Sequence, residues 1–360
     1  MDVIAANRSY EAWLRDQLEL VSEDLDRKHK LMRESAFVFL RATYFRWLQR
    51  IGEVAPRLAG PELACVGDLH VANFGTWRDA EGRLVWGIND FDESERLPYT
   101  YDLARLATSA LLAIDDGTLG LERDEACDAV LAGYRDALAE GGRPIVLAGR
   151  SEALAKLVTE VLASGPKSWW ADLFDDELPA PSRELHRIPD GARAALEAVL
   201  PAPGWVYETR RRVAGVGSLG RRRLALVGEH AGAPVARELK QLALPAGRWL
   251  GRPASDGVAL TSVVRSHDPF LHVAGGWVAR RLAPDCIKLD LAAAPSRDVE
   301  RRLLGWMGAE TANIHLADPD AVAAVNDDLD GRKRNWLRDV AVQMARATRD
   351  DHSTWRKKNS

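Results

Sequence analysis

The chain of 360 residues is 46% hydrophobic and 28% charged, and its formal net charge is −4. This length allows two or three domains or one large two-lobed domain, and the composition is that of an ordinary soluble globular protein. The nearly balanced charge gives no global electrostatic reason to expect nucleic acid or an anionic membrane surface as a partner.

The three cysteines, Cys65, Cys127 and Cys286, lie far apart and form no CxxC pair. Their spacing favours neither a disulfide framework nor a zinc site, and it suits a reducing compartment. The first residues lack the apolar core of a signal peptide, and no segment offers 18 uninterrupted apolar residues. From these features we expect a cytoplasmic protein with no membrane partner.

Helix-period apolar positions run through residues 8–52, with a break near Ser35. The run "ELACVGDLH" (62–70) then predicts a short strand that feeds a loop, and "RLVWGINDFD" (83–92) repeats that design. The pattern is helical again from residue 101 to about 162. Residues 163–203 predict a connector with one helix in "DGARAALEAVL".

The character changes over residues 205–244, where short apolar or alternating runs are separated by Gly-rich turns. This pattern is typical of antiparallel strands. Helical periodicity returns from about residue 298. The order helical, β-rich, helical predicts an α+β fold, and the sequence contains no internal repeat.

The β-rich part contains a glycine motif, G-x-G-x-x-G, with Gly215, Gly217 and Gly220 as its glycines. In a dinucleotide-binding fold a helix would follow, but here the next residues predict a strand, a turn and another strand. The alternative is a glycine-rich hairpin over nucleotide phosphates, followed by a strand with a phosphate-binding lysine, a place that Lys240 occupies. A plain β-turn with a surface lysine remains open.

Two polar loops, the first in "GDLHVANFG" (67–75) and the second in "INDFDES" (88–94), contain candidates for a base and metal ligands in the order that phosphoryl transfer needs. Such sites combine a carboxylate that orients the acceptor hydroxyl with oxygen ligands for Mg²⁺, and kinase-type loops place an Asn five residues after the base. Asp68 and Asn73 have this spacing, and Asp90 begins the next loop. Individually each could be a turn former or a helix cap.

The stretch "GDLH" also resembles a fragment of binuclear metallophosphatase sites. Those sites need several further Asp and His ligands from separate loops. The chain has eight His, and none lies in a GNH[DE]-like segment. Beyond Asp68 and His70 the required ligands do not assemble, so the kinase-type interpretation is favoured.

The stretches "GDLHVANFG" (67–75) and "INDFDES" (88–94) resemble the H-G-D-x-H-x-x-N and I-D-F-D motifs of aminoglycoside phosphotransferases and related small-molecule kinases, which share the protein-kinase fold. Val66 departs from the pattern, since it stands where the first His would be. The following "PYTYDLARL" is similar to the family's helix after the second metal loop, and the resemblance implies that Asp102 buttresses the site.

Most of the chain, from about residue 27 onward, resembles a bacterial domain-of-unknown-function family, number 2252. The matching stretches are "KLMRESAFVFLRA", "GDLHVANFG", "INDFDES", "YDLARLA", "VAGVGSLGRRR", "ELKQ" and "SHDPFL". Ordinary kinases place the glycine-rich loop and lysine first, whereas here they follow the catalytic and metal loops. The resemblance therefore implies a circularly permuted, two-lobed kinase-like fold. A helical lobe (1–200) would be followed by a β-rich nucleotide lobe (201–290) and C-terminal helices (291–360) that pack back on the helical lobe.

The resemblance also implies a role for each site residue, with ATP and Mg²⁺ as cofactors. Asp68 would be the catalytic base, and His70 would steady the loop or contact the acceptor. The metal ligands would be Asn73 and Asp90, with Asp92 as a further candidate. The phosphate-binding residues would be Gly215, Gly217, Ser218, Gly220 and Lys240.

One departure from the kinase pattern concerns the partner of Lys240, which a Glu on a nearby helix normally holds. No Glu lies between Lys240 and Asp285, so Asp256, Asp268 or a more distant residue would have to take that place. We expect an ATP- and Mg²⁺-dependent phosphotransferase acting on a hydroxyl of an unidentified acceptor, a small molecule being favoured over a protein. A catalytically weak nucleotide-binding module and a kinase-like nucleotidyltransferase stay open as alternatives.

Three further groups have weaker signals. Arg280 and Arg281 could line a cleft between lobes, but a solvated strand edge is favoured. His315 could reach the site from a helix, although a packed or surface position is favoured. Residues 221–223, "RRR", could form a local basic patch or an exposed strand.

Overall fold

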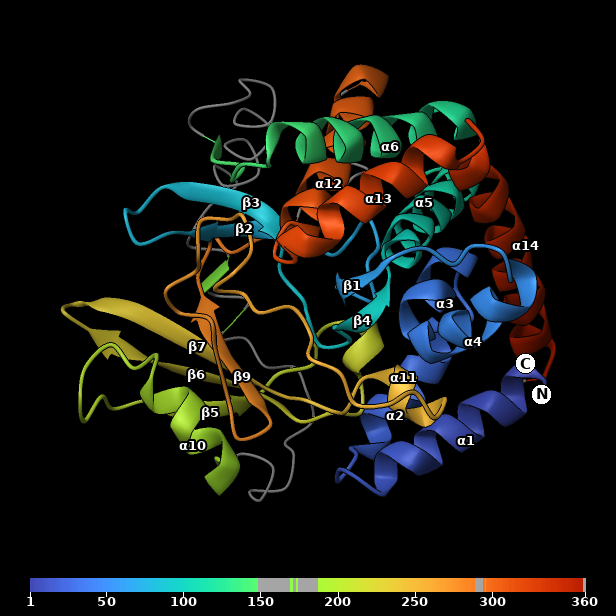
Figure 1. Cartoon of the computed structure of the whole chain (residues 1–360). Coiled ribbons are helices and arrows are strands. Elements are labelled where there is room, and N and C mark those ends of the chain that lie inside the picture. Colours follow the sequence, from blue (N-terminus) through green and yellow to red (C-terminus); the bar gives the residue numbers. More distant parts are fainter. Residues whose placement is uncertain (148–168, 171–172, 174–186, 289–293, 295, 359–360) are drawn as a thin grey trace.

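The computed structural model describes residues 1–147, 169–170, 173, 187–288, 294 and 296–358. Within these ranges the fold is α+β, as the sequence predicts, with most helices on one side of the molecule and the five-stranded antiparallel sheet, together with α10 (Asp190–Glu197), on the other (Figure 1). The end of the predicted helical pattern, residues 148–162, lies outside the described residues. No helix in these ranges is long and apolar enough to cross a membrane.

The N-terminal residues form a series of short helices, as their periodicity predicts. Ser35 marks the predicted break, because its hydroxyl accepts a hydrogen bond from the amide of Val38 and begins a new helix. The helices are α1 (Val3–Arg15), α2 (Ser22–Leu31), α3 (Ala36–Ala42) and α4 (Tyr44–Val54).

Two short antiparallel strand pairs place the two polar loops side by side. The pairs are β1 (Glu62–Cys65) with β4 (Glu95–Pro98), and β2 (Phe74–Arg78) with β3 (Leu84–Ile88). The end of β1 lies opposite the start of β4, and the start of β2 lies opposite the end of β3. The chain therefore crosses twice between the same two pairs, through residues 66–73 and 89–94, and the two crossings run next to each other.

Long helices from both ends of the chain share one hydrophobic core. They are α5 (Tyr99–Asp115), α6 (Arg123–Glu140), α12 (Arg297–His315), α13 (Pro319–Gly331) and α14 (Trp336–Lys358). In Figure 1 the two termini lie together, and an ion pair of 3.2 Å joins Lys358 to Asp2. The C-terminal helices thus pack on the N-terminal ones.

The β-rich part forms a five-stranded antiparallel sheet in the order β5-β6-β7-β9-β8. Its strands are β5 (Glu208–Arg211), β6 (Arg223–His230), β7 (Ala233–Gln241), β8 (His272–Ala274) and β9 (Trp277–Leu282). The predicted connector helix is present as α10 (Asp190–Glu197) and covers one face of the sheet.

Alternation along the strands determines which side chains point toward α10 and which point away from it. Leu224, Leu226 and Leu239 pack with α10 in one hydrophobic cluster. Successive side chains of a strand point to opposite faces, so Glu238 and Lys240, on either side of Leu239, point to the other face. That face is turned toward the two polar loops, because Lys240 contacts Asp90 there.

The connection between β7 and β8 ties the sheet to the helices. It contains α11 (Ala246–Trp249), and the ring of Trp249 packs edge-on against Tyr10 and Phe45 at 5.6 Å between centroids. The amide of Ala246 donates a 2.7 Å hydrogen bond to Glu93 in the second polar loop. Both packing and polar contacts therefore fix the position of the sheet relative to the loops.

Helices α6 and α12 approach closely enough that a side chain at Gly308 has no room. A Cβ there would lie 2.0 Å from the carbonyl oxygen of Val130, so Gly308→Ala must push the helices apart. Overpacking of this kind costs about 1–3 kcal/mol, and we expect a lower melting temperature by calorimetry.

The matched control is Gly305→Ala on the same helix, where the nearest atom would be at an ordinary 3.7 Å. Alanine is the better helix former, so this variant should be neutral or up to about 1 kcal/mol more stable. Equal melting temperatures for the two variants would contradict the close helix packing.

Candidate functional site

The first polar loop is held by one face of α5. Both carboxylate oxygens of Asp102 accept backbone hydrogen bonds, from the amides of Val66 at 2.7 Å and Gly67 at 2.9 Å. Gly67 has a φ of +84°, and a Cβ there would lie 2.2 Å from the carbonyl oxygen of Glu93. The loop therefore needs glycine at this point and Asp102 beneath it, which is the buttressing position that the resemblance implies.

Two further residues of α5 fix the rest of this loop. Arg105 forms an ion pair of 2.5 Å with Asp68, and the hydroxyl of Ser109 accepts a 3.0 Å hydrogen bond from the amide of Val71. Asp102, Arg105 and Ser109 are spaced so that they share a helix face. The loop is thus anchored at three points by one rigid element.

A buried polar network lies behind Asp102. His315 approaches Asp102 at 3.1 Å through Nε2, and its Nδ1 lies 2.8 Å from the hydroxyl of Tyr134. His315 is therefore packed, as favoured from the sequence, and its contact with the site runs through Asp102.

Cys65 completes a group with Asp102 and His315 whose ligand atoms lie within 4.8 Å of one another. A metal ion is not required to explain it, because Asp102 already accepts two amides. Burial also raises the pKa of the Cys65 thiol well above its usual value, which opposes the thiolate that a metal binds. We interpret this group as structural support for the loop.

Lys240 links the sheet to the second polar loop. Its Nζ lies 2.9 Å from both carboxylate oxygens of Asp90 and 2.6 Å from Asp92. Its partners are thus the aspartates of the predicted metal loop, rather than Asp256 or Asp268. Among the described residues no Glu forms an ion pair with Lys240. Because Lys240 is buried, the alternative of a turn with a surface lysine is wrong.

The two aspartates form a like-charged pair. Burial opposes ionisation of Asp90, but the charges of Lys240 and Lys288 and the hydrogen bonds to Asp90 together outweigh burial and hold its pKa well below the usual value. Burial and the negative charge of Asp90 together raise the pKa of Asp92. Arg221 also contacts Asp92 at 3.1 Å and Glu93 at 3.2 Å. A divalent cation would relieve the repulsion within this pair.

The donor set fits Mg²⁺, which prefers carboxylate and amide oxygens. The side-chain nitrogen of Asn73 donates hydrogen bonds of 3.3 Å to the backbone carbonyls of Asp68 and Asp90. This contact ties the two polar loops together and leaves the amide oxygen of Asn73 as its candidate metal ligand. The structure therefore brings Asn73, Asp90 and Asp92 together as predicted.

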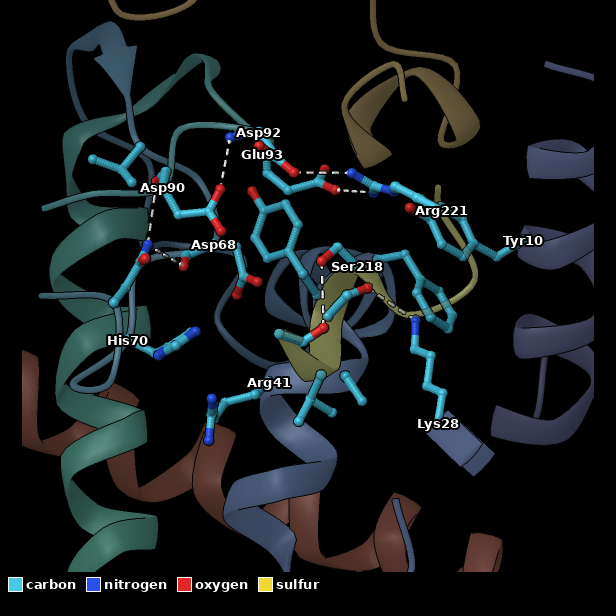
Figure 2. A pocket seen from close by; sticks show the side chains of 18 of the residues that line it. Tyr10, Lys28, Arg41, Asp68, His70, Asp90, Asp92, Glu93, Ser218 and Arg221 are labelled. Carbon is cyan, nitrogen blue, oxygen red and sulfur yellow. Dashed lines mark hydrogen bonds and ion pairs between the residues drawn. The ribbon is translucent and has the colours of Figure 1, made fainter. Parts of the chain in front are cut away.

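The glycine motif lies over Asp68. It joins β5 to β6 and contains a short 3₁₀ turn (Val216–Ser218). A Cβ at Gly217 would lie 3.0 Å from the carbonyl oxygen of Arg41 and 3.6 Å from Asp68. Figure 2 shows Ser218 of this turn facing the side of the cavity that carries Asp68 and Asp90.

Glycine is also required at both ends of the motif. Gly215 has a φ of +76°, and Gly220 has a φ of +100° with Leu25 2.6 Å from the position of a Cβ. The ammonium group of Lys28 donates to the carbonyl oxygen of Gly217 at 3.2 Å. The motif is thus a docked hairpin connection followed by a strand, and the expectation that no helix follows it is confirmed.

Two adjoining cavities meet at this site. A narrow one of about 60 Å³ contains Asp68, His70 and Asn73 in its wall, and a larger one of about 450 Å³ lies between the sheet and strand β2. Arg41, Asp90, Gly215 and Lys288 line both.

The protonation states of Asp68 and His70 suit proton handling. Burial raises the pKa of Asp68 although Arg105 lowers it, so the carboxylate is more basic than an exposed one. Burial and the charges of Arg41 and Arg105 hold the pKa of His70 well below its usual value, so it is neutral near pH 7. His70 Nδ1 accepts a 3.2 Å hydrogen bond from the amide of Ala72, which steadies the loop.

The favoured prediction for Arg280 and Arg281, a solvated strand edge, was wrong. Strand β9 is internal in the sheet, between β7 and β8, and both arginines line the larger cavity. Arg221 and Arg223 are also buried and paired with carboxylates, so residues 221–223 do not form an exposed strand.

Sequence reasoning missed Arg105, Ser109, Arg41 and Lys288. The helical spacing of Arg105 and Ser109 from Asp102 was readable, since "DLARLATS" places them on one face. Arg41 and Lys288 had no such signal, because each reaches the cavities only through the tertiary fold.

Residues 20–166 match the family model described as "Uncharacterized protein conserved in bacteria (DUF2252)". This segment belongs to that family. The family segment contains both polar loops and α5, and it confirms the resemblance of those stretches to family 2252. The glycine motif and Lys240 lie beyond the matched residues. No curated protein and no solved structure matches the chain.

Lys288 should be unusually reactive toward amine-selective reagents. Its side chain reaches solvent, yet burial of its ammonium group and the charges of Arg280, Arg41 and Lys240 lower its pKa to about 8. At pH 8 about half of its amine is neutral, against roughly 0.3% for a lysine with the usual value.

We expect mass spectrometry to show that acetic anhydride modifies Lys288 faster than the exposed Lys333 at pH 8, with the difference shrinking toward pH 10.5. Equal rates at pH 8 would contradict the crowding of positive charge around Lys288.

Proposed function

We propose that the protein is an ATP- and Mg²⁺-dependent phosphotransferase with a circularly permuted kinase-like fold, acting on a hydroxyl group of a small molecule. The observation that carries the proposal is the contact of Lys240 with Asp90 and Asp92. A lysine from the second strand after a glycine turn thereby meets the aspartates of a separate loop, beside a carboxylate suited to be a base.

Each residue has a role in this proposal. The acceptor oxygen attacks the γ-phosphorus of ATP, the bond from that phosphorus to the β–γ bridging oxygen breaks, and ADP leaves with the electron pair. The acceptor proton passes to Asp68, which later releases it to solvent. Arg105 orients Asp68 through their ion pair, and His70 steadies the loop or contacts the acceptor.

Mg²⁺ would be held by Asn73, Asp90 and Asp92, and when bound it would neutralise charge on the transferring phosphate. Lys240 would contact the α- and β-phosphates. Backbone amides of the turn at Gly215, Gly217, Ser218 and Gly220 would approach the phosphates from above.

The chain order is consistent with permutation. In Figure 1 the sheet with Lys240 lies beside the helical part although it follows the polar loops in sequence. Catalytic geometry depends on where side chains meet, and unrelated chain orders can produce one geometry. The predicted lobe boundaries near residues 200 and 290 belong to this proposal.

A second candidate is a catalytically weak nucleotide-binding module. It is favoured by the ion pairs of Lys240, since the lysine occupies both aspartates that would hold the metal and pairs with no Glu among the described residues. A kinase-like nucleotidyltransferase would use the same residues with ATP bound so that its α-phosphorus reacts.

Binding of ATP with Mg²⁺ should raise the melting temperature of the wild-type protein. Asp90→Ala should abolish this shift, because it removes a metal ligand and the partner of Lys240. Asp320→Ala, on the surface of α13, is the control and should keep the shift. Absence of a shift with every nucleotide tested would reject each kinase-like function.

Asp68→Ala should keep the ATP shift but lower turnover roughly 10²–10⁴-fold, the usual contribution of a positioned base. Transfer of label from γ-labelled ATP identifies a phosphotransferase, whereas transfer from α-labelled ATP identifies a nucleotidyltransferase. Unchanged turnover in Asp68→Ala would remove Asp68 from its role.

A further inference from the structure

Three arginines that line the larger cavity converge on one buried carboxylate behind its wall. Glu238 is fully buried, and its oxygens accept hydrogen bonds from Arg223 at 3.1 Å, from Arg280 at 2.7 Å and from Arg212. The arginines come from β6, from β9 and from the connection after β5. We call these three side chains the arginine cluster.

The arginine cluster carries more positive charge than Glu238 neutralises. Burial opposes ionisation of Glu238, but the three guanidinium groups outweigh it and hold its pKa well below the usual value. One negative charge thus faces three positive ones, and all three arginines line the larger cavity. Uncompensated cations at a partly buried site are costly unless an anion joins them.

Positive charge also exceeds negative charge in the rest of the cavity wall. Its other charged residues are the cations Arg41, Arg265, Arg281 and Lys288 and the carboxylates Asp90 and Asp268, and of these cations Arg281 forms an ion pair of 3.2 Å with Asp285. Nη1 of Arg265 is buried and lacks a hydrogen-bond partner within the described parts of the chain. The guanidinium group of Arg265 is also held over the ring of Trp77, at 4.3 Å from its centroid.

Sheet geometry makes the arginine cluster rigid. Arg223 lies opposite Lys240 in the β6–β7 register, and Arg280 lies directly opposite Glu238 in the β7–β9 register. Guanidinium groups held in place lose little entropy on binding and match the oxygens of phosphate groups through paired hydrogen bonds. A purely structural salt bridge would need one arginine for Glu238, not three.

We propose that the larger cavity binds an oligophosphate group, with the arginine cluster and Lys288 as its ligands. This cavity would recognise phosphate oxygens next to Asp90. The proposal rests on the proposed function only in that a phosphotransferase would use the bound phosphates. The phosphates belong either to the nucleotide or to a phosphorylated acceptor. Both sources present the same oxyanions to the same cations.

The test is calorimetric titration of the full chain with inorganic pyrophosphate, in the absence of nucleotide and Mg²⁺. Arg280→Gln and Lys288→Gln should each weaken binding about 10-fold or more, the usual loss for a hydrogen bond to a charged group. Arg302→Gln, an exposed arginine on α12, removes the same charge away from the cavity and should bind as the wild type does.

Lys288→Gln keeps the experiment decisive if Arg280→Gln fails to fold, because Lys288 is exposed and outside the Glu238 contacts. Absence of pyrophosphate binding by the wild type, or equal binding by Lys288→Gln and Arg302→Gln, would overturn the proposal.

A competition experiment with ATP distinguishes nucleotide phosphates from those of a phosphorylated acceptor. If ATP displaces pyrophosphate, the cavity holds the nucleotide phosphates; if both bind together, it holds the acceptor. Failure of the ATP shift described above would leave pyrophosphate binding intact, so the two proposals fail separately.

Discussion

The ion pairs of Lys240 with Asp90 and Asp92 hold the site together. They join the middle strand of the five-stranded sheet to the loop between β3 and β4. They also compensate two carboxylates that burial would otherwise force toward neutrality. Without them, the sheet face that carries Glu238 would lack its polar link to Asp90.

The neighbouring elements position the two polar loops and the sheet so that these ion pairs can form. The two strand pairs bring the polar loops together, and one face of α5 fixes the first loop through Asp102, Arg105 and Ser109. Strand alternation turns Glu238 and Lys240 to the same side of the sheet, and on that side the arginine cluster and Asp90 line one cavity. This juxtaposition of positive and negative groups is what a site for phosphates and a divalent cation requires.

Sequence reasoning predicted the features that are local. Periodicity located the N-terminal helices, the antiparallel strands and α10, and the spacing of Asp68, Asn73 and Asp90 identified residues that the fold brings together. It did not find the partners of Lys240, which lie about 150 positions away, because ion pairs of this range depend on how the sheet docks. It misjudged Arg280 and Arg281 because the short strand β8 makes β9 internal, and no sequence signal sets that strand order.

A crystal structure of the protein with Mg²⁺ and a non-hydrolysable ATP analogue would show whether Lys240 and Asp90 bind the phosphates. We expect the phosphates to lie between Lys240 and Asp90, beneath the turn at Gly217 and within reach of Asp68. A nucleotide bound elsewhere, or a Lys240 that keeps both aspartates while the nucleotide contacts neither, would contradict this expectation.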